Sequence, residues 1–181
     1  MKPIGPLMWE HRLIERMIAL LSSELDAFTQ TNVFHLDFLR QAIDFLRTYA
    51  DKTHHGKEEK IFFRELFNKP LSPEHRRILN ELIDEHETAR KLVASLDQAV
   101  REAEPQKQAN AQTISELVRG IVDFYPCHIK KEDQVIFYPA QDYLTKDEQD
   151  NMLAEFWEFD RRLIHEKYQE IVSGMESRLK A

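Results

Sequence analysis

The chain has 181 residues, which suffices for one domain whose core can hold a polar site without loss of the fold. Apolar residues make up 42% of the chain and charged residues 31%, with only four glycines and seven prolines, so most of the chain is free to be helical. The net charge of −7 argues against a nucleic-acid partner and an anionic membrane surface, because binding to phosphates needs a basic surface.

Apolar residues and histidines recur along the first half of the chain at steps of three and four, which predicts helices. A first helix is expected over residues 6–28, and its apolar stripe contains His11. A longer second helix is expected over residues 35–68. Its stripe turns polar for two successive turns, at His54 and Glu58.

The second half of the chain repeats this arrangement. A third helix is expected over residues 73–103, with His86 among aliphatic side chains. A fourth is expected over residues 111–138, and it places His128 and Glu132 on one face because they are four residues apart.

Capping signals mark the starts of the third helix and of a further helix near the C-terminus. Ser72 is the expected N-cap of the third helix, and Thr145 with Glu148 three residues later forms a capping-box pattern. The prediction is a single all-α domain over residues 1–181. It consists of an up-and-down four-helix bundle over about 7–140 and an additional C-terminal helix over about 145–179.

Compartment is predicted from cysteine content and the start of the chain. Cys127 is the single cysteine and cannot form an internal disulfide, and the first residues show no signal-peptide pattern. No window approaches the roughly 18 apolar residues that a membrane span needs. We therefore expect a cytoplasmic protein without membrane partners.

A short internal repeat carries the candidate ligands. The segment HHGKEEKIFF at 54–63 matches HIKKEDQVIF at 128–137, with His, Lys, Glu and Phe identical in register. A single His-x-x-x-Glu pair on a helix is often a surface pair, but two copies facing one axis are typical of a metal site. Burying these side chains without a cation would leave polar groups unpaired.

The predicted metal ligands come from four different helices: His11, His54, Glu58, His86, His128 and Glu132. Imidazole and carboxylate without thiolate favour iron, manganese or zinc, and two carboxylates among six ligands favour two bridged ions. We expect two non-haem iron ions with an oxo or hydroxo bridge, while manganese and zinc remain alternatives.

Other polar residues are expected to lie outside the site. His35, His55 and His75 lie off the apolar stripes or at helix starts, which favours solvent exposure. Cys127 is expected to be an inert buried thiol.

Over about residues 7–140 the chain resembles the hemerythrin-like family, in particular bacterial proteins with the HHE cation-binding domain. The runs that carry the resemblance are WEH, HHGKEE, DEHETAR and HIKKED. The resemblance implies a non-haem di-iron centre with two bridging carboxylates.

Two features depart from the oxygen-carrying members of that family, which have five histidines and end with a histidine and an aspartate five residues apart. Here no histidine lies four residues from His86, and the last pair is His128 with Glu132. The set is more similar to family members linked to repair of iron-sulfur clusters under nitrosative stress, whose N-terminal cysteine segment is not found in this sequence. His165 is a candidate for an additional ligand.

Two classes of function follow. The first is a metal-binding protein that binds or senses a small diatomic ligand such as O2 or NO at a bridged di-iron centre. The second is a di-iron enzyme that acts on peroxide or nitric oxide, or a donor of iron in the repair of iron centres. Oligomeric state is left open.

Overall fold

The computed structural model describes residues 2–103 and 110–179, and the side chains of these residues up to 163. Within these ranges the chain forms helices and no strand, which confirms the all-helical prediction. None of the described helices is long and apolar enough to cross a lipid bilayer.

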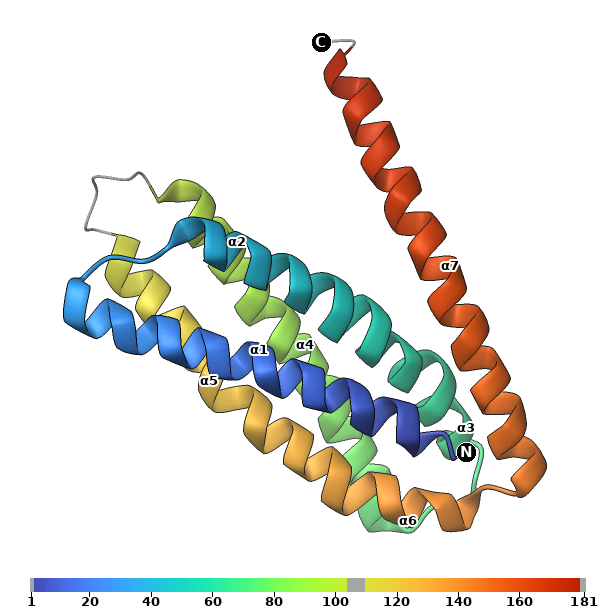
Figure 1. Cartoon of the computed structure of the whole chain (residues 1–181). Coiled ribbons are helices and arrows are strands. Elements are labelled where there is room, and N and C mark those ends of the chain that lie inside the picture. Colours follow the sequence, from blue (N-terminus) through green and yellow to red (C-terminus); the bar gives the residue numbers. More distant parts are fainter. Residues whose placement is uncertain (1, 104–109, 180–181) are drawn as a thin grey trace.

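The helical elements follow one another with short connections. They are α1 (Ile4–Thr31), α2 (Leu36–Phe45), η1 (Leu46–His55), η2 (Glu58–Phe63), α3 (Arg64–Phe67), α4 (Pro73–Glu102), α5 (Ala111–Lys131), η4 (Glu132–Phe137), α6 (Tyr138–Ala140), η5 (Gln141–Tyr143) and α7 (Lys146–Leu179). The elements from α2 to α3 form one long helical rod, and α5 continues into η4 and α6. Figure 1 shows α1, the α2-to-α3 rod, α4 and α5 side by side, while the C-terminal part of α7 points away from them.

Helix ends follow the predicted capping residues. The Ser72 side chain accepts a hydrogen bond from the backbone N–H of His75 at 3.1 Å, at the start of α4. At the start of α7, the Glu148 N–H donates to Thr145 Oγ1 at 3.3 Å, and the Thr145 N–H donates to Glu148 Oε2 at 2.8 Å. The capping box is therefore formed as expected.

Three segments near the centre of the molecule are π-helical: η1, η2 and η4. A π turn closes its hydrogen bonds from residue i to i+5, so it contains more residues than an α turn. Consecutive residues are then separated by a smaller rotation about the helix axis. Two neighbouring side chains can therefore face the same region of the core.

Two apolar clusters fill the bundle, with a polar layer between them. On α1, Leu7 belongs to one cluster and Ile14 to the other, and His11 lies between them. The same order holds on α4 around His86. Each long helix thus has a ligand-type residue at the level where its apolar stripe is interrupted.

The first half of α7 covers one side of the polar layer. A side chain at Gly56 would come within 2.8 Å of the Phe159 ring, so this close approach requires glycine. Next to it, Lys57 Nζ lies 2.9 Å from a carboxylate oxygen of Asp160. These contacts place α7 directly over the segment that carries the first His-Glu pair.

Candidate metal centre

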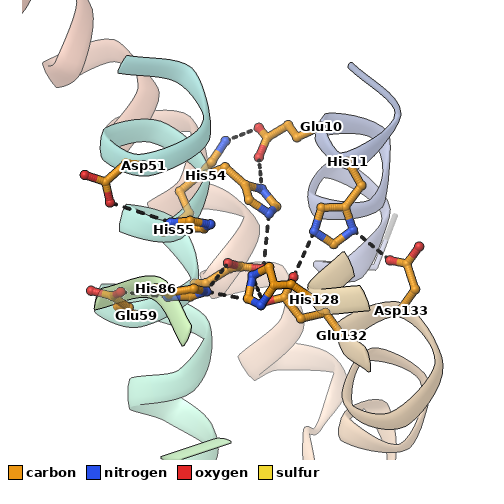
Figure 2. A network of polar contacts seen from close by, with 12 residues as sticks. Glu10, His11, Asp51, His54, His55, Glu59, His86, His128, Glu132 and Asp133 are labelled. Carbon is orange, nitrogen blue, oxygen red and sulfur yellow. Dashed lines mark hydrogen bonds and ion pairs between the residues drawn. The ribbon is translucent and has the colours of Figure 1, made fainter. Parts of the chain in front are cut away.

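The six predicted ligands converge in the polar layer. Figure 2 labels all of them except Glu58, whose carboxylate lies beside His54 and His86. Glu58 and Glu132 have no exposed surface, and the four histidines are at most 2% exposed. They come from α1, the α2-to-α3 rod, α4, and the α5–η4 junction: His11, His54, Glu58, His86, His128 and Glu132.

The Glu132 carboxylate lies between histidines on two sides. Its Oε2 is 3.1 Å from Nε2 of His11, whereas its Oε1 is 3.3 Å from Nε2 of His86. Oε1 also lies 3.4 Å from Nε2 of His128.

Glu58 is arranged in the same way. Its Oε1 is 3.3 Å from Nε2 of His54, and its Oε2 is 3.4 Å from Nε2 of His86. Each carboxylate therefore turns one oxygen toward each side of the centre, as a bridging ligand does.

The potential ligand atoms form two groups, in each of which they lie within 4.8 Å of one another. We call them the three-histidine end (His55, His86 and His128) and the two-histidine end (His11 and His54, with Glu58 and Glu132).

The presence of His55 corrects the sequence interpretation, which placed this residue in solvent. His55 is 1% exposed, and its ring stacks on that of His86 with centroids 3.9 Å apart. The prediction assumed an α-helical period, in which only His54 faces the core. Because η1 is π-helical, both neighbours face inward.

Carboxylates orient the ligands from outside the centre. Four histidines donate from Nδ1 to a carboxylate oxygen, which leaves Nε2 as the lone pair that faces inward. The pairs are His11 with Asp133 (2.8 Å), His54 with Glu10 (2.9 Å), His86 with Glu59 (2.7 Å) and His128 with Glu85 (2.8 Å). For His55, Nδ1 lies 3.6 Å from Asp51 Oδ1, which is longer than a hydrogen bond.

Each of these carboxylates outside the centre, which we call the outer carboxylates (Glu10, Asp51, Glu59, Glu85 and Asp133), also contacts a cationic side chain. Arg12 contacts Asp133, Lys57 contacts Glu10, and Lys131 contacts Glu85. Arg90 contacts two of them: its Nε lies 2.7 Å from Asp51 and a terminal guanidinium nitrogen lies 2.8 Å from Glu59. These cations favour the ionised carboxylates, which in turn hold the imidazoles in the tautomer suited to metal binding.

The residues present fit a metal centre. Several atoms that face the middle of the polar layer are buried without a hydrogen-bond partner: Nε2 of His11, His54 and His128, both carboxylate oxygens of Glu58, and Oε2 of Glu132. Leaving so many polar atoms unsatisfied costs several kcal/mol. Cations bound among them would satisfy both the nitrogens and the oxygens.

The electrostatics of the site also indicate missing positive charge. Burial raises the pKa of Glu58 well above its ordinary value, and the nearby charge of Glu132 raises this pKa further. Burial likewise lowers the pKa of His54 well below its ordinary value, with a smaller contribution from His11. Without a cation these two ligands thus favour their neutral forms. Burial raises the pKa of Glu132 as well, but the nearby His128 and His11 outweigh this effect and lower that pKa well below its ordinary value.

His11 behaves differently because two carboxylates contact it. Burial lowers its pKa, but the hydrogen bond to Asp133 and the contact with the Glu132 carboxylate outweigh this effect and raise the pKa to about 9. In the absence of metal a proton can thus occupy the position that a metal ion would take at Nε2.

The sequence of the chain was compared with models of known protein families. The model of the hemerythrin HHE cation-binding domain matches residues 3–175. The chain belongs to the hemerythrin HHE cation-binding family. Searches among curated proteins and among solved structures found no match. Membership in this family implies cation binding, and the buried His and Glu groups of the polar layer could hold the cation.

The hemerythrin domain of this chain is built from two halves with equivalent contacts. Glu10 and His11 in the first half correspond to Glu85 and His86 in the second, 75 residues later. The repeat at 54–63 and 128–137 is offset by 74. Lys57 and Lys131 each contact the carboxylate that orients the histidine three residues before them.

The stacking partners obey the same relation. Phe137 stacks on His11 with ring centroids 5.4 Å apart, and Phe63 stacks on His86 at 5.9 Å. The relation fails at His55, whose counterpart is Ile129. His55 is therefore the residue that makes the two ends of the hemerythrin site unequal.

The remaining sequence expectations had mixed outcomes. His35 is exposed and His75 is half-buried beside Tyr143, as solvent-side residues. Cys127 is exposed, so its expected burial was wrong; it precedes His128 on α5 and faces away from the site. The side chain of His165 lies outside the described residues.

From the sequence, Glu59 and Asp133 were expected either to support the ligands or to be exposed partners of nearby lysines, and they lie beside His86 and His11. The other outer carboxylates and the cations were missed. A signal for two of them was available, since a glutamate directly precedes both His11 and His86. For Arg90 and Asp51 the sequence carries no such repeat, and only the packing of η1 against α4 brings them together.

Proposed function

We propose that this hemerythrin-domain chain binds two non-haem iron ions in an up-and-down four-helix bundle that carries one extra C-terminal helix. Glu58 and Glu132 would bridge the two ions. His55, His86 and His128 would hold one ion, and His11 and His54 the other.

The observation that carries this proposal is the double orientation of both carboxylates. Each turns one oxygen to a histidine of the two-histidine end and the other to His86. A single ion would need only one side of each carboxylate. Nitrogen and oxygen donors without sulfur suit iron, and manganese or zinc could occupy the same donors.

We further propose that the centre binds or senses a small ligand such as O2 or NO. With one oxygen from each bridging carboxylate, the chain supplies five donors at the three-histidine end and four at the two-histidine end. A closed structural site would leave no position for a ligand, whereas this donor set, with the expected oxo or hydroxo bridge added, leaves a position at the two-histidine end. Bound iron would supply the redox couple and the open position.

The chain's own residues favour binding over turnover. The outer carboxylates are each engaged by a histidine on one side and a cation on the other. They are therefore committed to holding ligands in place rather than to moving protons onto a substrate. The two apolar clusters above and below the polar layer limit the entry of water.

The test is metal analysis of anaerobically purified protein, combined with absorption spectra of the reduced form before and after addition of O2 or NO. About two irons per chain and a new band that disappears on removal of the ligand would support the proposal. Two irons with irreversible oxidation and no band would contradict the ligand-binding part. Negligible metal after reconstitution would contradict the proposal as a whole.

An enzymatic role makes a different prediction. Iron-loaded protein would then consume peroxide or nitric oxide over many turnovers, and a Glu58→Ala variant would not. Steady consumption by the wild-type protein would replace the binding proposal with the enzymatic one.

A further inference from the structure

The cation that supports His54 is buried, whereas the equivalent cation of the second half is partly exposed. The side chain of Lys57 is 1% exposed, and that of Lys131, 74 residues later, is 32% exposed. Both contact the carboxylate that orients a ligand histidine. An ammonium group that is removed from water needs more than one acceptor, because its three N–H donors lose their hydration.

Helix α7 supplies the second acceptor for Lys57. Nζ of Lys57 lies 2.9 Å from Oδ1 and 3.1 Å from Oδ2 of Asp160. In the second half the acceptor at this place is Glu81, whose Oε2 lies 4.0 Å from Nζ of Lys131. Position 6, which is 75 residues before Glu81, holds a proline. The repeat therefore gives the first half no carboxylate at this place, and α7 provides one from elsewhere in the chain.

The sequence also makes room for α7 beside the first half. Gly56 lets the Phe159 ring come close, since a Cβ atom there would lie 2.8 Å from it. The equivalent position in the second half is the exposed Lys130. Phe156 is buried and fixes α7 to the apolar core. Asp160 lies one turn beyond this anchor, before the C-terminal part of α7 points away from the bundle (Figure 1).

These contacts form a continuous path from α7 to the two-histidine end. Asp160 contacts Lys57, and Lys57 contacts Glu10. Oε2 of Glu10 in turn lies 2.9 Å from Nδ1 of His54. Because Lys57 shares its charge between two carboxylates, Asp160 leaves Glu10 a stronger acceptor than it would be in an isolated pair. A stronger acceptor at Nδ1 makes the imidazole a better donor to a metal ion at Nε2.

We infer that Asp160 is a positioning residue for the two-histidine end, which couples α7 to the metal ion that has an open position. The inference rests on the proposed function, since it names a regulation of that same centre. It predicts that the negative charge of Asp160 matters, and not only the cover that α7 provides. Because coupling between two sites is reciprocal, metal binding at this end should also hold α7 more firmly.

The first test replaces Asp160 by asparagine, which keeps the shape of the side chain and removes its charge. Zinc is titrated in competition with a chelator of known affinity. Asp160→Asn should weaken the weaker of the two binding steps, which belongs to the end with fewer protein donors, by about 10-fold, the lower limit usual for lost support behind a ligand. The stronger step should not change.

Two further variants complete this test. Asp160→Glu keeps the charge and should keep the wild-type affinities. Asp150→Asn is the matched control on the same helix, since Asp150 is 52% exposed and pairs with Lys146. It should leave both binding steps unchanged.

A second measurement observes His54 directly. In zinc-loaded protein, the NMR shift of the Nδ1 proton follows the strength of its hydrogen bond to the carboxylate. Asp160→Asn should move the His54 resonance upfield and leave that of His128 in place. Zinc should also slow amide hydrogen exchange at residues 157–160 of the wild-type protein, and it should do so less in Asp160→Asn.

Two outcomes would overturn the inference. One is an Asp160→Asn variant with wild-type affinities and an unshifted His54 resonance, because α7 would then serve only as a cover. The other is a loss of affinity in both binding steps that Asp160→Glu does not restore, because the substitution would then act on folding.

The inference and the proposed function fail in distinguishable ways. A wild-type protein that holds two irons and gives no ligand band contradicts ligand binding, while the zinc measurements still decide the inference. A wild-type protein that gives the band, with Asp160→Asn indistinguishable from it in the zinc measurements, contradicts the inference alone. Negligible binding of iron and zinc contradicts both.

Discussion

At the scale of single residues, His55 shows how a local change of helical geometry decides which side chains enter a site. It is adjacent to His54, and in an α-helix only one of the two could continue the apolar stripe. The π turns of η1 bring both into the core, where His55 is the third imidazole of one group. Whether it binds metal is open to direct measurement.

Replacing His55 by alanine should remove about half of the bound metal, because the three-histidine end would lose one of its three imidazoles. Elemental analysis after reconstitution with excess iron measures the effect. His35→Ala is the matched control, since the His35 side chain is 73% exposed, and it should retain the full content. Full metal content in His55→Ala would remove this residue from the ligand set.

Arg90 acts on the same end without touching a ligand. Its guanidinium contacts both Asp51 and Glu59, the carboxylates that face Nδ1 of His55 and His86. Arg90→Gln should weaken metal binding by about 10- to 100-fold, which is the usual effect of losing support behind a ligand. Competition with a chelator of known affinity measures the change.

The control for Arg90 lies on the same helix. Arg101 pairs with Asp97 and is 72% exposed, so Arg101→Gln should leave metal affinity unchanged. If both arginine variants lose affinity equally, the effect comes from net charge and not from the contacts of Arg90.

At the scale of helices, most of the architecture could be predicted because steps of three and four are a strong signal over long segments. The expected second helix over 35–68 corresponds to the rod from Leu36 to Phe67. The stripe positions of His11, His86 and His128 were sufficient to bring them together. The π segments could not be predicted, since they depend on packing against α4 and α5, and the residues that follow from them were missed.

The capping box of α7 gives a prediction at this scale. Thr145→Ala removes the acceptor for the Glu148 N–H and should destabilise the start of α7 by about 1 kcal/mol. Amide hydrogen exchange of residues 146–149 should accelerate, while exchange in α4 stays constant. Unchanged exchange at the start of α7 would show that Lys69 and Glu148 hold it without the cap.

The same helix start should respond to acid. Hydrogen bonds, first from Lys69 and then from Thr145, lower the pKa of Glu148 from 4.5 to about 2. A carboxylate with a lowered pKa contributes its stabilisation fully above the ordinary value and loses it as the pH falls through the folded value. The protection of amides 146–149, measured relative to their intrinsic exchange rates, should therefore decrease between about pH 4.5 and pH 2, and Glu148→Gln should abolish this dependence.

At the scale of the whole molecule, the two apolar clusters are joined across a layer of buried polar atoms. Removing metal should lower the melting temperature, because a ligand bound only by the folded state stabilises it by mass action. At free metal of 100 times the dissociation constant the stabilisation is about 2.7 kcal/mol. Calorimetry of loaded and chelated protein measures it, and equal melting temperatures would contradict tight binding.

Glu58→Gln separates this effect from a general loss of packing. In the absence of metal the variant should melt higher than the wild-type protein. Burial raises the pKa of Glu58, so folding without metal at neutral pH must add a proton to this carboxyl, whereas an amide of similar shape is neutral in both states. In the presence of metal the order should reverse. A variant that is less stable under both conditions would mean that Glu58 serves packing alone.

The contact between His11 and Asp133 joins residues 122 positions apart. On the ribosome, at roughly 5–20 residues per second, the synthesis of His11 would precede that of Asp133 by on the order of 6 to 24 seconds. During that interval the first half of the bundle has only part of the site, with His54 and Glu10 already available to each other. Complete metal loading is therefore an event that follows synthesis of the second half of the chain.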